Sequence, residues 1–174
     1  MCIRDRGLAK LRPVMPDGTV TFGSQTHPSD GNCGMIVTTR DKAKQLSRNA
    51  GMEIQLLSYA QARTKKGFMA KATAPAARAA LDNAGVSLDQ IDVLKTHNPF
   101  AVNDVYLARE LGRSIDSFNN YGSSLIYGHP QGPTGMRLII ETIEELALKG
   151  GGHGLFVGCA AGDTAAAVVL KVGG

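Results

Sequence analysis

Apolar and polar residues follow two spacings along this chain, one typical of strands and one typical of helices. Short runs rich in β-branched and aliphatic residues, some with alternating polarity, predict strands. The run nearest the C-terminus is almost uninterrupted Ala, Val and Leu, which is typical of a strand covered on both faces. We expect strands at residues 19–22, 34–39, 52–62, 91–95, 154–158 and 164–172.

Helices are predicted between these strands, and each is closely followed by a glycine that can end it. Thr39 is the expected N-cap of the first helix, and Asn98 is the expected N-cap of the third, with Pro99 at its first position. The four helices are expected at residues 40–49, 76–83, 100–111 and 134–149.

The last of these helices has an apolar stripe at the 3.6-residue period. Glu145 and Lys149 are spaced to form an ion pair, which we place on the solvent side. The stripe consists of Met136, Ile139, Ile140, Ile143 and Leu146. Helices that alternate with strands in this order predict an α/β fold, with a mixed sheet and helices on its faces.

Composition narrows the class of protein. The 174 residues are 43% hydrophobic and 20% charged, as in a globular protein. The net charge of +4 is mild, and the small basic group Arg63, Lys65 and Lys66 suits a phosphate-bearing cofactor, nucleic acid or plain solvated surface, of which we favour the last. We find no nucleic-acid motif and no metal-ligand set, and we expect neither partner. We also find no secretory signal and no apolar run of about 20 residues, the length that spans a bilayer.

Three cysteines, Cys2, Cys33 and Cys159, lie far apart in the sequence. Neither a disulfide framework nor a zinc site follows from that spacing, so we expect a reducing, cytoplasmic location. The first six residues have no pattern, and we expect residues 1–16 to be a non-native N-terminus and the tail of a loop region.

His129 lies in a glycine-rich turn, Gly128-His-Pro, shortly before the last predicted helix. The positive end of a helix dipole disfavours an imidazolium, so we expect a neutral histidine that can exchange a proton. A loop histidine that only satisfies nearby backbone groups is the competing interpretation.

Cys159 ends an apolar strand and is followed by Ala160, Ala161 and Gly162. Small residues let main-chain N–H groups approach a ligand, as an oxyanion hole requires. A thiol needs a nearby base to react at neutral pH. Alternatively, Cys159 is a buried structural cysteine. His97 follows another strand, where α/β proteins place ligands, but this segment could equally be a simple helix-capping turn.

Taken together, these segments resemble the C-terminal half of the thiolases, a family of acyl-CoA acyltransferases. The resemblance runs from about Leu11 to Val172 and rests on several motifs in the family's order. They are Asp17-Gly-Thr-Val-Thr-Phe-Gly23, His97-Asn-Pro-Phe-Ala101, Gly128-His-Pro-Gln-Gly132 with Gly135 and Arg137, and Cys159-Ala-Ala-Gly162. The resemblance implies a thiolase-like layered fold, with residues 17–50 as the end of the N-terminal domain and residues 51–174 as the C-terminal domain.

The resemblance also implies roles for individual residues. His129 would match the histidine that activates the nucleophile and helps to hold the thioester oxygen. Cys159 would match the cysteine that moves the proton α to the carbonyl, and His97 the residue that holds a water facing the substrate oxygen. For the ligand, Thr26 would contact the pantetheine arm and Phe100 would line the pocket. Ala161 stands where the family has a glycine whose N–H serves the oxyanion hole.

The implied function is a thioester Claisen condensation or the thiolytic cleavage of a 3-ketoacyl-CoA. Coenzyme A thioesters would be substrates, with no permanently bound cofactor, and the full-length form would be a homo-oligomer. The family's nucleophilic cysteine lies in its first half, which this chain lacks, so we expect no turnover from the chain alone. The alternative is a non-catalytic thiolase-like protein that binds or transfers acyl-CoA.

Overall fold

A computed structural model describes residues 5–49 and 51–173. Its centre is a four-stranded sheet formed by β1 (Ile54–Arg63), β2 (Ile91–His97), β3 (Gly152–Ala160) and β4 (Thr164–Val172). The strand order is β1-β4-β3-β2. Strand β4 pairs antiparallel with β1 and β3, whereas β2 and β3 are parallel, so the sheet is mixed. The predicted α/β class is confirmed.

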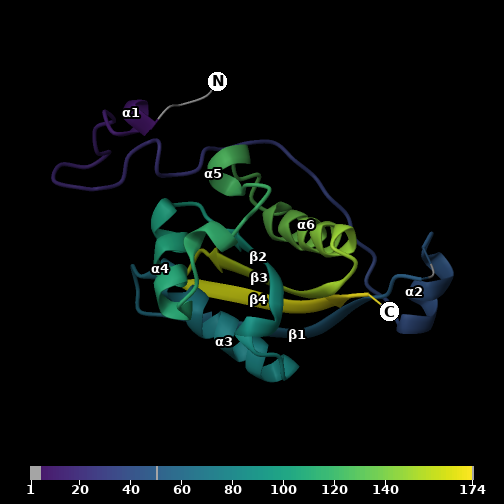
Figure 1. Cartoon of the computed structure of the whole chain (residues 1–174). Coiled ribbons are helices and arrows are strands. Elements are labelled where there is room, and N and C mark those ends of the chain that lie inside the picture. The colour runs from purple at the N-terminus through teal and green to yellow at the C-terminus, as the bar shows by residue number, and fades with distance from the viewer. Residues whose placement is uncertain (1–4, 50, 174) are drawn as a thin grey trace.

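Helices cover both faces of the sheet (Figure 1). On one face, α3 (Thr73–Ala84) and α4 (Ala101–Leu111) pack with the sheet in the larger core. Helix α3 approaches closely because its inward positions are alanines with no exposed surface, such as Ala76 and Ala80. On the other face, α6 (Thr134–Leu148) contributes Leu146 to a smaller core with Val93 and Leu170.

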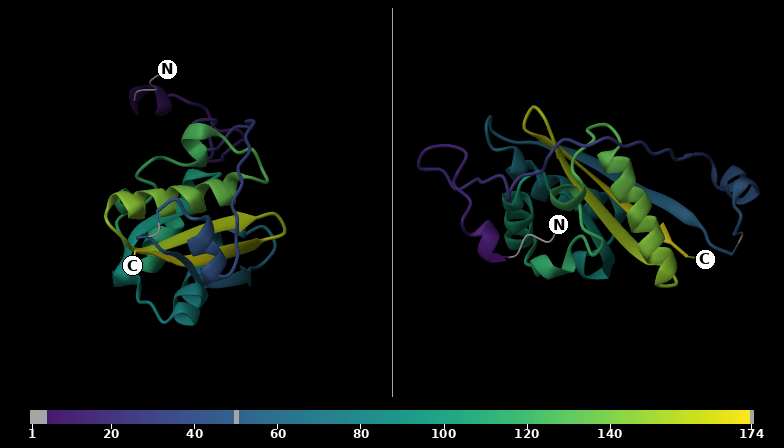
Figure 2. Two further views of the ribbon diagram at one scale, coloured as in Figure 1. Left: turned by 90° about the vertical axis from the view of Figure 1, so that its right-hand side faces the viewer. Right: turned by 90° about the horizontal axis from the view of Figure 1, so that it is seen from above.

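Shorter helices lie in the connections. They are α1 (Asp5–Leu8), α2 (Arg40–Leu46), α5 (Ser124–Tyr127) and the single 3₁₀ turns Met69–Ala72, Leu88–Gln90 and Ile115–Ser117. Residues 9–24 form a loop with several turns, and residues 25–39 are largely extended and run past α5 and α6 to α2, as the views from two further sides show (Figure 2). This segment is tied to the loops of the sheet by backbone hydrogen bonds, including Thr26 N–H to Pro99 O at 2.7 Å and Ala101 N–H to Ser24 O at 2.9 Å.

Two predicted strands do not form. Residues 19–22 make only one isolated bridge, between Thr21 and Pro13, and residues 34–39 have no regular structure. Their sequences are suited to strands, but a strand is stable only when a neighbouring strand completes its hydrogen bonds. In the described ranges neither segment has such a neighbour beyond the single Thr21–Pro13 bridge. Ile36 and Val37 are consequently 78% and 67% exposed.

Several boundaries also differ from the predictions. Helix α2 ends at Leu46 rather than Asn49, and Phe100, not Asn98, is the N-cap of α4. In α6, Met136 is exposed and Leu138 and Thr142 are buried, so the inward face is rotated from the predicted stripe.

The pair Lys149–Glu145 exists at 3.4 Å, but Glu145 is buried rather than on the solvent side, because it also pairs with Lys95. The first four residues of the expected non-native N-terminus lie outside the described residues.

Candidate active site

His97 is the last residue of β2, at the edge of the sheet where β2 and β3 both end. Its side chain is buried, and its Nδ1 lies 2.6 Å from the hydroxyl of Ser124. The imidazole packs against that of His129, with ring centroids 4.3 Å apart and planes tilted by 32°. Burial, with smaller contributions from His129 and Arg137, lowers the pKa of His97 to about 4. His97 is therefore neutral at physiological pH.

His129 is held in place by its backbone and by one hydroxyl. Its N–H donates to the carbonyl of His27 at 2.9 Å, and its Nδ1 lies 2.8 Å from Thr134 Oγ1. The preceding Gly128 has φ +84°, and a Cβ there would lie 2.7 Å from Cβ of Ser29, so only glycine fits.

Burial lowers the pKa of His129 below its usual value. The sequence-based prediction of a neutral imidazole gave a different cause, the dipole of the following helix. Helix α6 begins at Thr134, five residues beyond His129, and burial is the cause that the structure supports. The two histidines therefore approach each other closely because neither carries a charge.

Cys159, near the end of β3, is 8% exposed, and its Sγ accepts a hydrogen bond from Asn103 Nδ2 at 3.2 Å. Burial raises the pKa of its thiol to about 11, against the smaller opposing effect of the Asn103 amide. The sulfur is thus a protonated thiol at neutral pH, suited to donating a proton to a strongly basic carbon.

A cavity of about 280 Å³ brings these groups together. Its wall includes His97, His129, Cys159 and Ala161, with Phe156 and Ala166 supplying apolar surface. Two imidazoles and a thiol, drawn from three separate parts of the sequence, thus share one small space.

Two of the predicted ligand-contacting residues lie outside the wall of that cavity. Thr26 donates from Oγ1 to the carbonyl of Ser124 at 2.5 Å, and Phe100 caps α4 and bridges to Gln25. Their predicted roles toward a pantetheine arm and an acyl pocket stay predictions, as do the chemical roles of His97, His129, Cys159 and Ala161.

A buried polar network beneath the site was not foreseen from the sequence. The carboxylate of Asp104 accepts from Asn98 Nδ2 at 2.7 Å, from Asn119 Nδ2 at 3.2 Å and from the hydroxyl of Thr96. Burial raises the pKa of Asp104, and these hydrogen bonds oppose the shift. The network joins the end of β2 to α4 and to the loop at Asn119, so it fixes the backbone that carries His97.

Asn98 illustrates what could have revealed this network. A helix N-cap was the simplest interpretation of Asn98 before Pro99, but its amide instead donates to Asp104 and its Oδ1 accepts from Leu125 N–H at 3.1 Å. The spacing of Asn98 and Asp104 around a helix start was the available signal.

Asn119 has φ +50°, a conformation that asparagine tolerates better than most residues.

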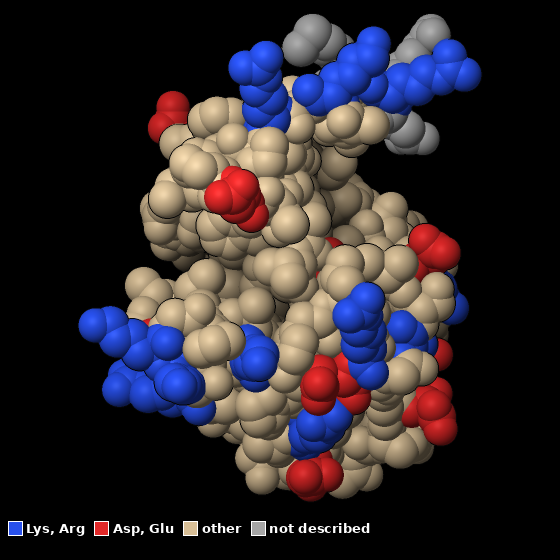
Figure 3. Space-filling view, turned by 90° about the vertical axis from the view of Figure 1, so that its left-hand side faces the viewer, with Lys and Arg blue, Asp and Glu red and all other residues tan. Residues whose placement is uncertain are grey.

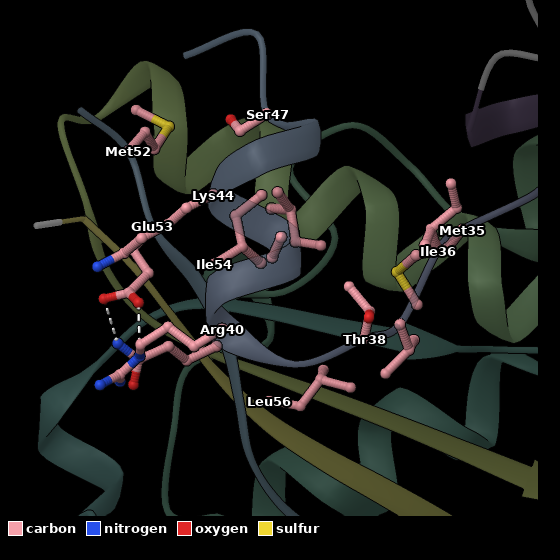
Figure 4. A pocket seen from close by; sticks show the side chains of 14 residues that line it. Met35, Ile36, Thr38, Arg40, Lys44, Ser47, Met52, Glu53, Ile54 and Leu56 are labelled. Carbon is pink, nitrogen blue, oxygen red and sulfur yellow. Dashed lines mark hydrogen bonds and ion pairs between the residues drawn. The ribbon is translucent and has the colours of Figure 1, made fainter. Parts of the chain in front are cut away.

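A larger cavity of about 500 Å³ lies between α2, the preceding extended segment and β1 (Figure 4). Its wall is mostly apolar, with Ile36, Ile54 and Leu56 facing it, and Arg40 pairs with Glu53 at its rim at 2.6 Å. None of the described residues in its wall carries a thiol or an imidazole, so we assign the chemistry to the smaller cavity.

Neither a metal centre nor a membrane-spanning helix is found in residues 5–49 and 51–173. There, no three His, Cys, Asp or Glu side chains are grouped so that they could hold a metal ion. In the same residues, no helix has the length and apolar character needed to cross a membrane. On the face shown in Figure 3, basic side chains form separate groups with acidic ones among some of them, in keeping with the mild net charge.

Comparison with known proteins defines the class to which this domain belongs. The family model described as "Thiolase, C-terminal domain" matches residues 51–172. The chain belongs to the thiolase family, and the match is to the C-terminal domain of that family.

Relatives extend the comparison to nearly the whole chain. The 3-ketoacyl-CoA thiolases of Pseudoalteromonas translucida and Pseudoalteromonas atlantica are 35% and 36% identical over 95% of the chain. A crystal structure of Bacillus anthracis acetyl-CoA acetyltransferase matches 96% of the chain with a TM-score of 0.88 and 29% identity. Human mitochondrial 3-ketoacyl-CoA thiolase matches 95%, with a TM-score of 0.83 and 27% identity. In each case the chain spans 42% of the length of the relative.

Proposed function

We propose that this chain is the C-terminal part of a thiolase-type acyl-CoA acyltransferase, which cleaves 3-ketoacyl-CoA with free CoA or joins two acyl-CoA units. The observation that carries the proposal is the shared cavity, in which the His97 and His129 rings lie 4.3 Å apart and Cys159 forms part of the wall. The relatives named for these two activities support the same reaction class.

In the cleavage direction, a nucleophilic thiolate from outside these residues attacks the 3-keto carbon. The bond between C2 and C3 then breaks, and its electron pair remains on C2 as an enolate of the departing acyl-CoA. The Cys159 thiol donates its proton to C2, which fits the raised pKa of about 11. The resulting Cys159 thiolate regains a proton when the thiol of free CoA attacks the acyl-enzyme and releases the second acyl-CoA.

The two histidines act on oxygen and on the nucleophile. His129 activates the nucleophilic thiol and helps to hold the thioester oxygen. His97 stabilises the substrate oxygen beside it. Both roles suit neutral imidazoles, because a neutral ring can donate one N–H to a developing negative charge without placing a fixed charge in the cavity. The Ala161 N–H contributes to the same oxyanion site from the cavity wall.

The remaining parts of the proposal concern the ligand and the assembly. CoA and its thioesters are substrates rather than a resident cofactor, with Thr26 and Phe100 contacting the pantetheine arm and acyl chain. We include a homo-oligomeric full-length form and a cytoplasmic location in the proposal. Within the described residues, Cys33 and Cys159 are both free thiols, which fits a reducing compartment.

One observation favours a second candidate, a thiolase-like protein that binds or transfers acyl-CoA without chemistry. Cys159 is buried, and among the residues that the structure describes no basic group hydrogen-bonds its sulfur; the partner is the neutral amide of Asn103. A thiol in these surroundings would also serve as an ordinary packing residue.

The substitution Cys159→Ala in the longer protein separates the two candidates. The catalytic role predicts a loss of roughly 10²-fold or more in kcat for 3-ketoacyl-CoA cleavage, as for the loss of a general acid. Cys33→Ala is the matched control, because Cys33 is a half-buried cysteine outside the cavity and should leave kcat unchanged. An unchanged kcat in Cys159→Ala would instead support the binding protein.

A further inference from the structure

The two histidines of the cavity share an arrangement that the proposed mechanism does not explain. Each has its Nδ1 beside a buried hydroxyl, Ser124 for His97 at 2.6 Å and Thr134 for His129 at 2.8 Å. In each ring, Nε2 is then the nitrogen that is left for a ligand. The state of Nε2 depends on whether the hydroxyl donates to Nδ1 or accepts from it.

The direction of the hydrogen bond at His97 follows from the surroundings of Ser124. Ser124 has no exposed surface, and its hydroxyl has no other hydrogen bond among the described residues. If Nδ1 of His97 carried the proton and donated it, the O–H of Ser124 would be a buried donor without an acceptor. Such a group is strongly disfavoured. If Ser124 donates, both groups are satisfied, so Nδ1 is the acceptor.

We propose that Ser124 is a positioning residue that fixes His97 in the tautomer with its proton on Nε2, so that His97 itself presents an N–H donor to the cavity. The imidazole of His97 lines that cavity, where an N–H donor would face a substrate oxygen directly. The tautomer follows from contacts within this chain. Only the use of the Nε2–H group to stabilise a substrate oxygen rests on the proposed function.

The backbone of Ser124 is itself anchored, which keeps the hydroxyl in place. Its carbonyl accepts from Thr26 Oγ1 at 2.5 Å and from Gly128 N–H at 2.9 Å. The neighbouring Ser123 donates from Oγ to the carbonyl of Thr96 at 2.6 Å, so the two serines hold the last residues of β2 from the same turn. Ser123 contacts the backbone of β2, whereas Ser124 contacts the ring of His97.

The tautomer can be read from the two ring nitrogens of His97 by ¹⁵N NMR on the purified 174-residue chain near pH 7, where the ring is neutral. We expect an unprotonated-type signal for Nδ1 and a protonated-type signal for Nε2. In Ser124→Ala the preference should weaken by about fivefold in the ratio of the two tautomers, the effect of one buried hydrogen bond. Ser124→Thr retains the hydroxyl and should restore the native pattern.

Matched variants separate positioning from general disturbance. Ser123→Ala removes a buried serine hydroxyl from the same turn and should leave the His97 signals unchanged. The His129 signals, with their own hydroxyl partner, are the internal reference in every variant. Ser124→Cys has almost the native volume but a weaker donor, so it tests the same point if the alanine variant does not fold.

Two results would overturn the proposal: a protonated Nδ1 in the native chain, or native His97 signals in both Ser124→Ala and Ser124→Cys. Neither measurement requires turnover, so failure here is distinguishable from failure of the proposed acyltransferase function.

Discussion

At the scale of single residues, burial controls the chemistry of the site. It keeps His97 and His129 neutral and keeps the Cys159 thiol protonated, because in each case the charged form would lose hydration without gaining a charged partner. The three groups can therefore lie around one cavity without mutual repulsion. A change in solvent access would alter the pKa of all three groups together.

The lowered pKa of His97 predicts a dependence of stability on pH. The ring has a pKa of about 4 in the folded chain and near 6.5 when unfolded. The unfolded state thus binds more protons between these values, so His97 lowers the free energy of unfolding as pH falls from about 7 to about 4. Over this pH range the effect amounts to roughly 3 kcal/mol.

His97→Gln, which keeps a polar side chain that can accept from Ser124, should remove this contribution. Urea unfolding across the same pH range measures it as the difference between the two proteins. Asp104, whose pKa is raised, acts in the opposite sense: its contribution favours the folded state as pH falls through the raised value. Because Asp104 is present in both proteins, it largely cancels, and parallel pH curves for the two would contradict the prediction.

The candidate site residues that were easiest to single out from the sequence are those whose type restricts their chemistry, and their roles stay predictions. Histidine and cysteine are rare in this chain, so the histidine after Gly128 and the cysteine at a strand end could be found by inspection of the sequence. The residues that surround them could not. Ser124, Asn103 and Asp104 are common residue types, and only the packing of α4 and α5 against the ends of β2 and β3 brings them to the site.

At the scale of elements, local signals predicted helices better than strands. Helices α3 and α4 end at Gly85 and Gly112, which both have φ near +65°, as their sequences indicated. Strand formation depends on a partner, which is why residues 52–62 became β1 beside β4 but residues 34–39 remained irregular. A helix forms most of its backbone hydrogen bonds within itself, whereas a strand needs a neighbouring strand to form them.

The ion pair between β2 and α6 also could not be predicted from the local sequence, because its two residues lie far apart in the chain. Lys95 has no exposed surface, its Nζ lies 2.6 Å from Glu145 Oε2, and it sits 4.0 Å from the centre of the Tyr121 ring. Glu145 also accepts from Asn120 Nδ2 at 2.7 Å. A lysine two residues before His97 thus links the strand, the helix and the loop that precedes the Gly128 turn.

Removing one charge of this pair should destabilise the fold strongly. Lys95→Met leaves Glu145 buried with fewer partners, and we expect a loss of about 3 kcal/mol in the free energy of unfolding. The double variant Lys95→Met with Glu145→Leu should recover much of that loss, because no unpaired charge remains. Urea unfolding measures both.

The exposed pair Arg78–Glu110, at 3.5 Å between α3 and α4, provides the control. Glu110→Gln should change stability by less than about 1 kcal/mol, as is usual for solvated pairs. If Lys95→Met were as mild as this control, Lys95 and Glu145 would not form a buried pair in solution.

At the scale of the whole molecule, several large apolar side chains that belong to neither core are exposed to solvent. Phe22, Ile36 and Leu148 are each more than 75% exposed, and Ile54 and Leu56 beside the larger cavity are about half exposed. The α6 face of the sheet is covered only in part, as Figure 1 shows. Such surface is typical of proteins that bury it against another part or another chain.

We therefore predict that the 174-residue chain self-associates, and that the apolar wall of the larger cavity contributes to the association. Burial of apolar surface stabilises by about 25 cal/mol per Å², so covering Ile36 and Val37 favours contact with any complementary apolar surface. Sedimentation velocity over a wide range of concentrations should show larger species for the native chain, and fewer for the double variant Ile36→Ser with Val37→Thr. Leu148→Gln is the matched control, since Leu148 is equally exposed but lies at the end of α6 and outside that cavity wall. Equal effects of the two changes would attribute the association to general hydrophobicity, and a monomeric native chain at all concentrations would contradict the prediction altogether.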